Sequence, residues 1–233
     1  MNFLKSWLIF LLIACFCAWL LPRARYRTIV IHHTASQSDS LASIRRAHGA
    51  RGWYDIGYHL VLANGQAGVP AGHLEVGARY RWGGYSVATR NKWCNVTALH
   101  LTLVGNYENA PFPRHLQPAL ANAVRTLCRR YGIDPANIHL HRDCSATACP
   151  GRHIDRDAIQ RWLKTDPEAV PQALAAQHER ALRQTLVAPL PIGLSVFGLE
   201  IALWSIVRRW RKRRRSERDE PVQSGGPQRG DIE

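Results

Sequence analysis

Two long apolar stretches frame the chain. Trp7–Leu21 is fifteen apolar residues without interruption, and counted from Phe3, across Lys5 and Ser6, the stretch reaches nineteen residues. The second stretch, Leu186–Val207, contains two prolines, two glycines and Glu200. Because about 17–25 apolar residues cross a bilayer as a helix, we predict transmembrane helices over residues 3–21 and 186–207. A cleaved signal peptide or lipoprotein signal is the alternative for the first stretch, and an interfacial helix for the second.

A dense basic cluster follows the second stretch. Seven of the eight residues in Arg208–Arg215 are Lys or Arg. Positive charge beside a membrane segment favours the cytoplasmic side. We therefore predict a cytoplasmic tail over residues 208–233, with the middle of the chain on the other side of the membrane. Arg23, Arg25 and Arg27 oppose this orientation, and we expect the larger cluster to outweigh them.

The middle of the chain alternates between strand and helix periods. Four short segments rich in β-branched and apolar residues predict strands: Tyr26–His33, Tyr58–Ala63, Ala98–Val104 and Ile138–His141. Apolar residues at helical spacing predict three helices: a short one carrying Leu41 and Ile44, a long one over Pro113–Tyr131, and Arg156–Leu163. Asn64-Gly65 favours a hairpin turn.

These elements define the fold class and the domain limits. Strands interleaved with covering helices predict an α/β domain, a mixed central sheet flanked by helices, over residues 26–165. Residues 166–185 are polar and rich in Ala and Gln, which predicts a helical tether to the second apolar stretch.

Charge and cysteine content narrow the possibilities only slightly. The chain carries a formal charge of +14, and residues 26–165 contain 17 Lys/Arg against 8 Asp/Glu. Such a surface attracts polyanions in general, so charge alone does not choose among nucleic acid, anionic lipid and anionic wall polymers. Six cysteines are too few and too scattered for a disulfide framework. Cys144 is expected in the core, although a disulfide with Cys94 is possible outside the cytoplasm.

Three residues offer a possible metal site. His32 lies near the end of the first predicted strand, His141 ends the fourth, and Cys149 follows eight residues later. Neighbouring strand residues point to opposite faces, so only one of His32 and His33 can face a given site. Two imidazoles and one thiolate match a tetrahedral Zn²⁺ site whose fourth position is open to water, which is the catalytic arrangement. The spacing alone is a weak signal.

Four motifs in a fixed order strengthen this hypothesis. They are IVIHHTAS at residues 29–36, GWYDIGYH at 52–59, LVGN at 103–106 and HRDCSATACPG at 141–151. Together they resemble the N-acetylmuramoyl-L-alanine amidase family, which includes phage amidase-type lysozymes and animal peptidoglycan recognition proteins. The resemblance covers residues 26–163 and implies that family's α/β fold and its activity, cleavage of the amide between the muramoyl group and L-alanine of peptidoglycan.

The resemblance also implies residue roles. His32, His141 and Cys149 match the family's zinc ligands. Tyr58 matches the tyrosine beside the metal-bound water and the substrate carbonyl, and Thr147 matches the residue that stabilises the oxyanion. Hydroxyl groups are suitable donors toward a tetrahedral intermediate. The glutamate that other members carry on the central strand is Thr102 here, so the general base stays unassigned.

The chain departs from the family pattern in one region. Arg79 replaces a histidine that often follows a Val-Gly-Ala/Ser sequence, and the following connection is long and contains Trp82 and Trp93. Aromatic faces and basic groups suit sugar rings and carboxylates, so these three residues are candidate substrate-binding residues. An elaborated surface loop is the alternative. His100 replaces a residue that is usually small, and we expect it to serve packing, with an approach to the metal as the alternative.

We therefore predict a membrane-held zinc amidase whose domain faces the periplasm at the bacterial inner membrane, serving wall remodelling or phage-type lysis. The alternative is a peptidoglycan-binding receptor without catalysis, although a pure binder needs no zinc. No nucleic-acid partner is expected, because the basic residues form no recognised groove-reading motif and topology explains the C-terminal cluster.

Overall fold

The computed structural model describes residues 7, 10, 25–164 and 169–184. Within them five strands form one sheet in the order β3-β2-β4-β1-β5. The strands are β1 Thr28–His33, β2 Leu60–Leu62, β3 Leu74–Val76, β4 Ala98–Leu103 and β5 Ile138–Leu140. All neighbours pair in parallel except the edge strand β3, which is antiparallel to β2. The sheet is therefore mixed, as predicted.

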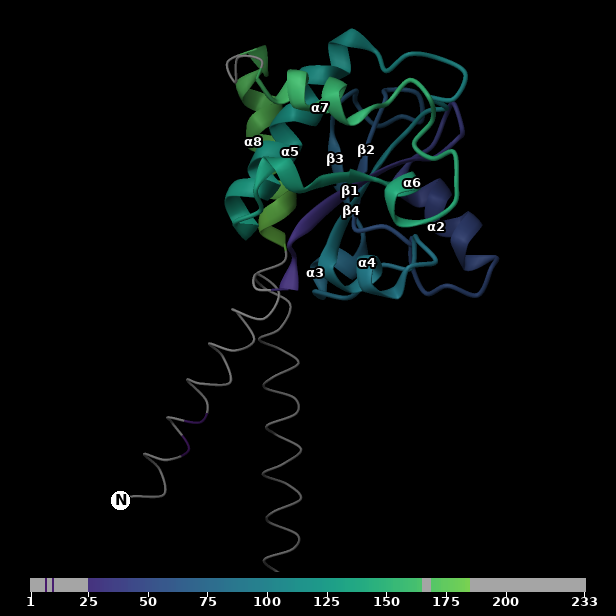
Figure 1. Ribbon diagram of the computed structural model, residues 1–233, viewed down its shortest axis with the longest axis vertical. Helices are drawn as coiled ribbons and strands as arrows, with labels where there is room; N and C mark the ends of the chain where they lie inside the picture. Colours follow the sequence, from purple (N-terminus) through teal and green to yellow (C-terminus); the bar gives the residue numbers. More distant parts are fainter. Residues whose placement is uncertain (1–6, 8–9, 11–24, 165–168, 185–233) are drawn as a thin grey trace, which may run out of the picture. The chain divides into compact units, whose positions relative to one another are not determined.

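Helices cover both faces of the sheet (Figure 1). The longer ones are α2 Leu41–Gly49, α5 Gln117–Tyr131, α7 Arg156–Leu163 and α8 Gln172–Arg183. Shorter turns are α3 Ala78–Arg81, α4 Lys92–Thr97, α6 His141–Cys144, η1 Arg114–Leu116 and η2 Pro135–Asn137. Helix α5 packs against α7 and α8 on one side of the sheet, and α2 and α6 lie on the other.

Strand alternation separates a hydrophobic face from a polar one. On β4, Leu99, Leu101 and Leu103 join the main core under α5. The residues between them, His100 and Thr102, are also fully buried but face the opposite side. A smaller apolar cluster beneath α2 lies on that second side of the sheet. The second face of the sheet therefore carries buried polar side chains that can form a site.

The predicted strands and helices are largely confirmed. Helix α2 begins after Ser40, whose side chain accepts a hydrogen bond from the Ser43 N–H, and α5 ends at Gly132 in the left-handed conformation that glycine adopts without strain. The sequence did not predict β3, α3 or α4. Strands β2 and β3 do form an antiparallel pair, but a loop over residues 63–73 joins them in place of the tight turn expected at Asn64-Gly65.

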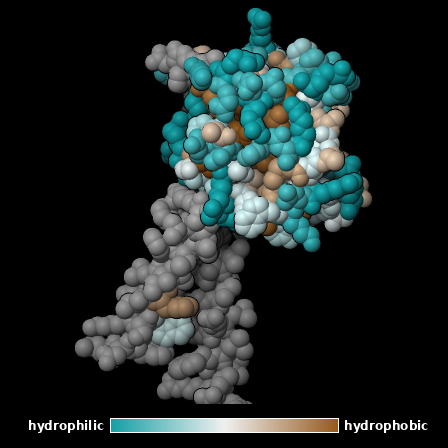
Figure 2. All heavy atoms as spheres, in the orientation of Figure 1, coloured by the Kyte–Doolittle hydropathy of each residue, from teal (hydrophilic) through white to brown (hydrophobic). Residues whose placement is uncertain are grey.

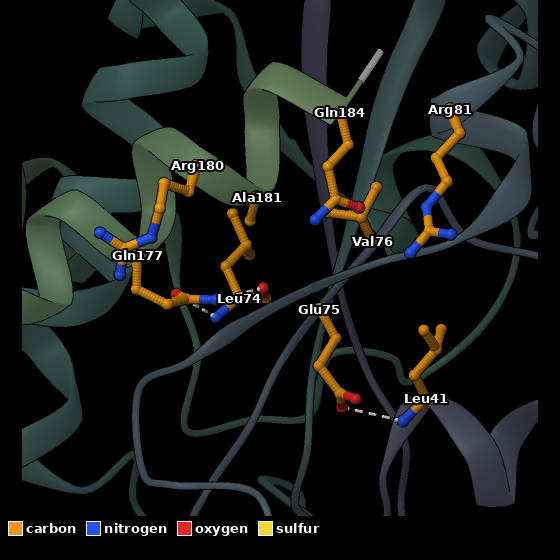
Figure 3. A pocket seen from close by; sticks show the side chains of 9 residues that line it. All are labelled: Leu41, Leu74, Glu75, Val76, Arg81, Gln177, Arg180, Ala181 and Gln184. Carbon is orange, nitrogen blue, oxygen red and sulfur yellow. Dashed lines mark hydrogen bonds between the residues drawn. The ribbon is translucent and has the colours of Figure 1, made fainter. Parts of the chain in front are cut away.

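Helix α8 packs on the domain, which goes beyond the connecting role expected for residues 166–185. Its Gln177 side chain donates to the Leu74 carbonyl and accepts from the Leu74 N–H, at 2.8 and 3.0 Å, as a neighbouring strand would (Figure 3). The exposed edge of β3 is thus partly satisfied. A hollow of about 390 Å³ opens beside this contact, bordered by Glu75, Arg81 and Arg180.

The two predicted transmembrane helices, residues 3–21 and 186–207, lie outside the described residues apart from two isolated positions. Among the residues that are described, no helix has the length and apolar character needed to cross a bilayer. The domain surface in Figure 2 is mostly hydrophilic, with hydrophobic side chains visible in gaps between polar ones.

Candidate metal centre

The structure brings together the three residues predicted to bind metal. One ligand atom from each of His32, His141 and Cys149 lies within 4.8 Å of the others. The His32 and His141 rings are 4.5 Å apart between centroids, and His32 Nδ1 lies 3.9 Å from the Cys149 sulfur. His32 is fully buried, whereas His141 and Cys149 are partly exposed. The cluster thus has a buried floor and an open side.

Neighbouring parallel strands explain how His32 and His141 meet. His32 lies near the end of β1, and His141 follows directly after β5, which pairs with β1. As expected from strand alternation, only one histidine of the pair at residues 32–33 enters the site. The His33 ring instead accepts a hydrogen bond from the Tyr107 N–H at 3.2 Å. Its backbone N–H still reaches the Cys149 sulfur at 3.3 Å.

A braced loop positions Cys149. The Arg142 N–H donates to the Cys149 carbonyl at 3.0 Å, which ties the loop to the first turn after β5. The Arg142 guanidinium donates to the Gly151 and Ile154 carbonyls at 2.9 and 2.5 Å. Arg142 therefore holds the loop, and Asp143 pairs with Arg156 at 2.8 Å. These contacts give Arg142 and Asp143 a bracing role.

The electrostatics of the cluster favour neutral imidazoles. Burial holds the pKa of His32 well below its usual range, and the nearby His100 and His141 imidazoles add to the effect. Burial also lowers the pKa of His141. It raises the pKa of the Cys149 thiol to about 11, against the opposing effects of the His33 N–H and the Arg142 charge. A cation bound here would supply the positive charge that a thiolate needs.

The donor set fits zinc. Four-coordinate Zn²⁺ with bonds of about 2.0–2.3 Å keeps its ligand atoms roughly 3.3–3.8 Å apart. The 3.9 Å between His32 Nδ1 and the Cys149 sulfur is close to this spacing. Two imidazoles and one thiolate are ligands that zinc prefers. The partly exposed side of the cluster leaves room for a fourth ligand from solvent.

Tyr58 and Thr147 both border the cluster. The Tyr58 ring lies 5.1 Å from the His32 ring between centroids. Burial raises the pKa of its hydroxyl to about 12, the Cys149 thiolate adds to the shift, and the Thr102 hydroxyl opposes it. The Thr147 hydroxyl accepts a hydrogen bond from the Cys149 N–H at 3.3 Å. The Tyr58 ring and the Thr147 hydroxyl therefore lie beside the candidate metal ligands, and their catalytic roles stay predictions.

The three candidate substrate-binding residues differ in exposure. Trp82 and Trp93 are 57% and 73% exposed, so their ring faces are accessible. Arg79 is buried, and its guanidinium donates to the Ile56 and Tyr85 carbonyls. These internal contacts occupy much of Arg79, and binding of substrate by the three residues stays a prediction.

Two further features lie beside the cluster. Cys94 and Cys144 form a disulfide between α4 and α6, so the expected core position of Cys144 is wrong and the alternative pairing is confirmed. His100 lies against the candidate ligand His32, with its Nδ1 2.9 Å from His32 Nε2. The sequence signal for this contact was His100 itself, a histidine where the family resemblance expects a small residue. We expected packing to be its role, and the contact with His32 shows that packing is only part of it.

The similarity of this chain to known proteins agrees with the geometry of the site. The family described as N-acetylmuramoyl-L-alanine amidase matches residues 22–152, more than half of the chain. The chain is 28% identical to the endolysin of Enterobacteria phage T3 over 143 residues, covering 58% of this chain and 87% of the endolysin. It is 25% identical to a peptidoglycan-recognition protein of Drosophila simulans over 153 residues, covering 61% of this chain and 77% of that protein.

Solved structures show the same fold. The N-acetylmuramoyl-L-alanine amidase LysC from Clostridium intestinale URNW matches with a TM-score of 0.52 at 23% identity, covering 62% of this chain and 89% of that one. At this identity the likeness concerns the fold. The family match extends across the strands and loops that carry His32, His141 and Cys149. The chain belongs to the N-acetylmuramoyl-L-alanine amidase family.

Proposed function

We propose that this protein is a zinc-dependent N-acetylmuramoyl-L-alanine amidase that hydrolyses the amide between the muramoyl lactyl group and L-alanine in peptidoglycan. The observation that carries the proposal is the convergence of His32, His141 and Cys149 on one partly open point. Membership of the family supports the reaction and the substrate class.

Each residue of the site has a chemical task in this reaction. His32, His141 and Cys149 would hold the metal, which when bound supplies Lewis acidity toward a carbonyl oxygen and lowers the pKa of water. The Tyr58 hydroxyl is protonated at neutral pH, and burial raises its pKa further to about 12, so it can donate a hydrogen bond toward water or the substrate carbonyl. Thr147 offers a second hydroxyl beside Cys149.

The proton acceptor is not a carboxylate on β4. Thr102 lies opposite His32 in the β1–β4 register, where the family resemblance expects a glutamate. Another group must therefore accept the proton from water. Tyr58 lies beside His32 and keeps its own proton at neutral pH, so it is suited to relay a proton rather than to act as a strong base.

We also propose that the domain is held at the bacterial inner membrane and faces the periplasm, with a cytoplasmic tail. The apolar stretches at residues 3–21 and 186–207 and the basic cluster after them support this placement. A reporter that is active only in the cytoplasm, fused after Glu233, should be active. An inactive cytoplasmic reporter together with an active periplasmic one would reverse the orientation.

The activity is tested on the full-length chain purified in detergent. Bound zinc is measured by elemental analysis, and release of new L-alanine amino groups is measured with purified peptidoglycan. Cys149→Ser should lose both zinc and activity, whereas Cys128→Ser, at a buried cysteine of α5, should keep both. Tyr58→Phe should keep zinc and lose most activity, with the exposed Tyr85 changed to Phe as its control.

The outcomes separate the amidase from the alternative receptor. A wild-type protein that holds no zinc and releases no amino groups contradicts the proposal. A protein that binds peptidoglycan but leaves its amides intact supports the non-catalytic peptidoglycan-binding receptor instead.

A further inference from the structure

A line of hydrogen bonds runs from the backbone of α4 to the metal cluster. His100 Nε2 lies 3.1 Å from the Cys94 carbonyl oxygen, and His100 Nδ1 lies 2.9 Å from His32 Nε2. The other nitrogen of His32, Nδ1, is the one near the Cys149 sulfur. His32 and His100 are both fully buried, so the line is shielded from bulk water.

The chemistry of the first acceptor fixes the direction of every bond in this line. A backbone carbonyl only accepts, so His100 Nε2 must carry the hydrogen. In a neutral imidazole the His100 Nδ1 then carries no hydrogen, so it must accept a hydrogen bond from the His32 Nε2–H. His32 Nδ1 is consequently left with a free lone pair on the side of Cys149. This is the form in which an imidazole binds a metal.

A second histidine holds His100 in this arrangement. His59 Nε2 lies 3.0 Å from the Gly84 carbonyl, so it donates, and His59 Nδ1 accepts the His100 backbone N–H at 3.0 Å. Both rings are fully buried, which favours the neutral form of each imidazole. The arrangement of donors and acceptors is therefore consistent along the whole line.

We propose that His100 is a positioning residue that locks His32 in the tautomer with a bare Nδ1 facing the metal, in an arrangement anchored on the Cys94 carbonyl. The inference rests on the zinc site of the proposed function. The partners of metal-bound imidazoles set the tautomer and ring orientation, and their loss typically lowers metal affinity about 10- to 100-fold.

The Cys94–Cys144 disulfide links Cys94, on whose carbonyl this arrangement is anchored, to the site a second time. Cys94, whose carbonyl receives the His100 bond, is linked to Cys144, the last residue of α6. Helix α6 begins with the ligand His141. The covalent link therefore connects the anchor of one ligand histidine to the short helix that presents the other.

Two substitutions separate a positioning role from simple packing. His100→Leu fills similar volume without any acceptor, whereas His100→Asn places its side-chain oxygen near the former Nδ1 and can accept from His32 Nε2. Zinc affinity of the full-length chain is measured by competition with a chromophoric chelator. We expect a loss of about 10- to 100-fold for His100→Leu and substantial recovery for His100→Asn. His178→Leu, at a buried histidine of α8, is the matched control and should leave zinc affinity unchanged.

Nitrogen-15 NMR of the histidine rings in the metal-free wild-type protein gives a readout that needs neither a variant nor activity. We expect His32 to carry its hydrogen on Nε2. A hydrogen on Nδ1, or a His100→Leu variant with wild-type zinc affinity, would overturn the positioning role. A wild-type protein that binds no zinc while His32 has the expected tautomer would overturn the zinc site of the proposed function and leave the hydrogen-bond line standing.

Discussion

Gly151 lies two residues after Cys149, in a backbone conformation that only glycine adopts easily. Its φ is +99°, and a Cβ placed there would lie 2.2 Å from the Tyr107 carbonyl carbon and 2.3 Å from the Glu108 nitrogen. Both contacts are with backbone, which cannot rotate away as a side chain can. Gly151→Ala should therefore both strain the loop and push it away from its neighbour.

Gly132 provides a matched comparison. Its φ is +66° at the end of α5, but nothing lies within 4 Å of an added Cβ. Gly132→Ala therefore isolates the cost of the left-handed conformation, about 1–2 kcal/mol. Gly151→Ala carries a similar backbone cost together with an overpacking cost of about 1–3 kcal/mol, so we expect a total of about 3 kcal/mol or more.

Thermal unfolding followed by circular dichroism measures the difference. In a domain of this size each kcal/mol moves the melting temperature by about 2–4 °C, so Gly132→Ala should lower it by about 5 °C and Gly151→Ala by about 10 °C. Because the Gly151 carbonyl also accepts the Arg142 bond that braces the Cys149 loop, zinc affinity should fall only in Gly151→Ala. Equal melting temperatures for the two variants would refute the steric reasoning.

Three further predictions concern pH, a buried ion pair and the disulfide. Burial lowers the pKa of His178 and of His59, that of His59 to about 3, so each ring binds a proton more readily in the unfolded chain, where histidines titrate near pH 6.5. The free energy of unfolding, measured in urea, should thus be constant above pH 7 and fall as the pH drops to 5, by up to about 1.4 kcal/mol per pH unit for each such histidine, and a flat profile would contradict this. The buried Asp55 carboxylate accepts from Arg45 and from the Ala78 N–H, so Asp55→Ala should cost about 1–3 kcal/mol in the same assay, and a loss near zero would contradict that contact pattern. Replacing both disulfide cysteines by Ser should weaken zinc binding measurably in the chelator competition, and unchanged affinity would show that the link does not support the site.

The parts of the fold that the sequence predicted correctly are those with a strong local pattern. Strand β4 alternates leucine with smaller or polar residues, and α5 carries one continuous apolar stripe ended by Gly132. Strand β3 has only three residues with a glutamate at its centre, and its place is set by pairing with β2 rather than by its own composition. Helix α4 depends on the Asn91 cap, a local signal that the polar sequence around it obscured.

The same distinction separates the predictable and unpredictable parts of the site. His32 and His141 could be placed together because each ends a buried strand, and the ends of parallel neighbours meet at one edge. The His100 contact required the register of β4 against β1, in which His100 pairs with Val30. A shift of one residue would have turned His100 toward the leucine core, which the alternating leucines of β4 prevent. The local sequence does not say which strand pairs with β4, or which residue of that strand lies opposite His100.

Strand β4 therefore serves stability and chemistry with alternate residues. Its three leucines bury apolar surface under α5, which holds the strand in register. That register in turn places the His100 ring against the His32 ring, and it places Thr102 opposite His32 in the β1–β4 pairing. Burying an imidazole that has no hydrogen-bond partner costs free energy. His100 avoids this cost because both of its ring nitrogens and its backbone N–H have hydrogen-bond partners. The leucine core thus fixes the geometry in which a buried, neutral histidine can orient a metal ligand.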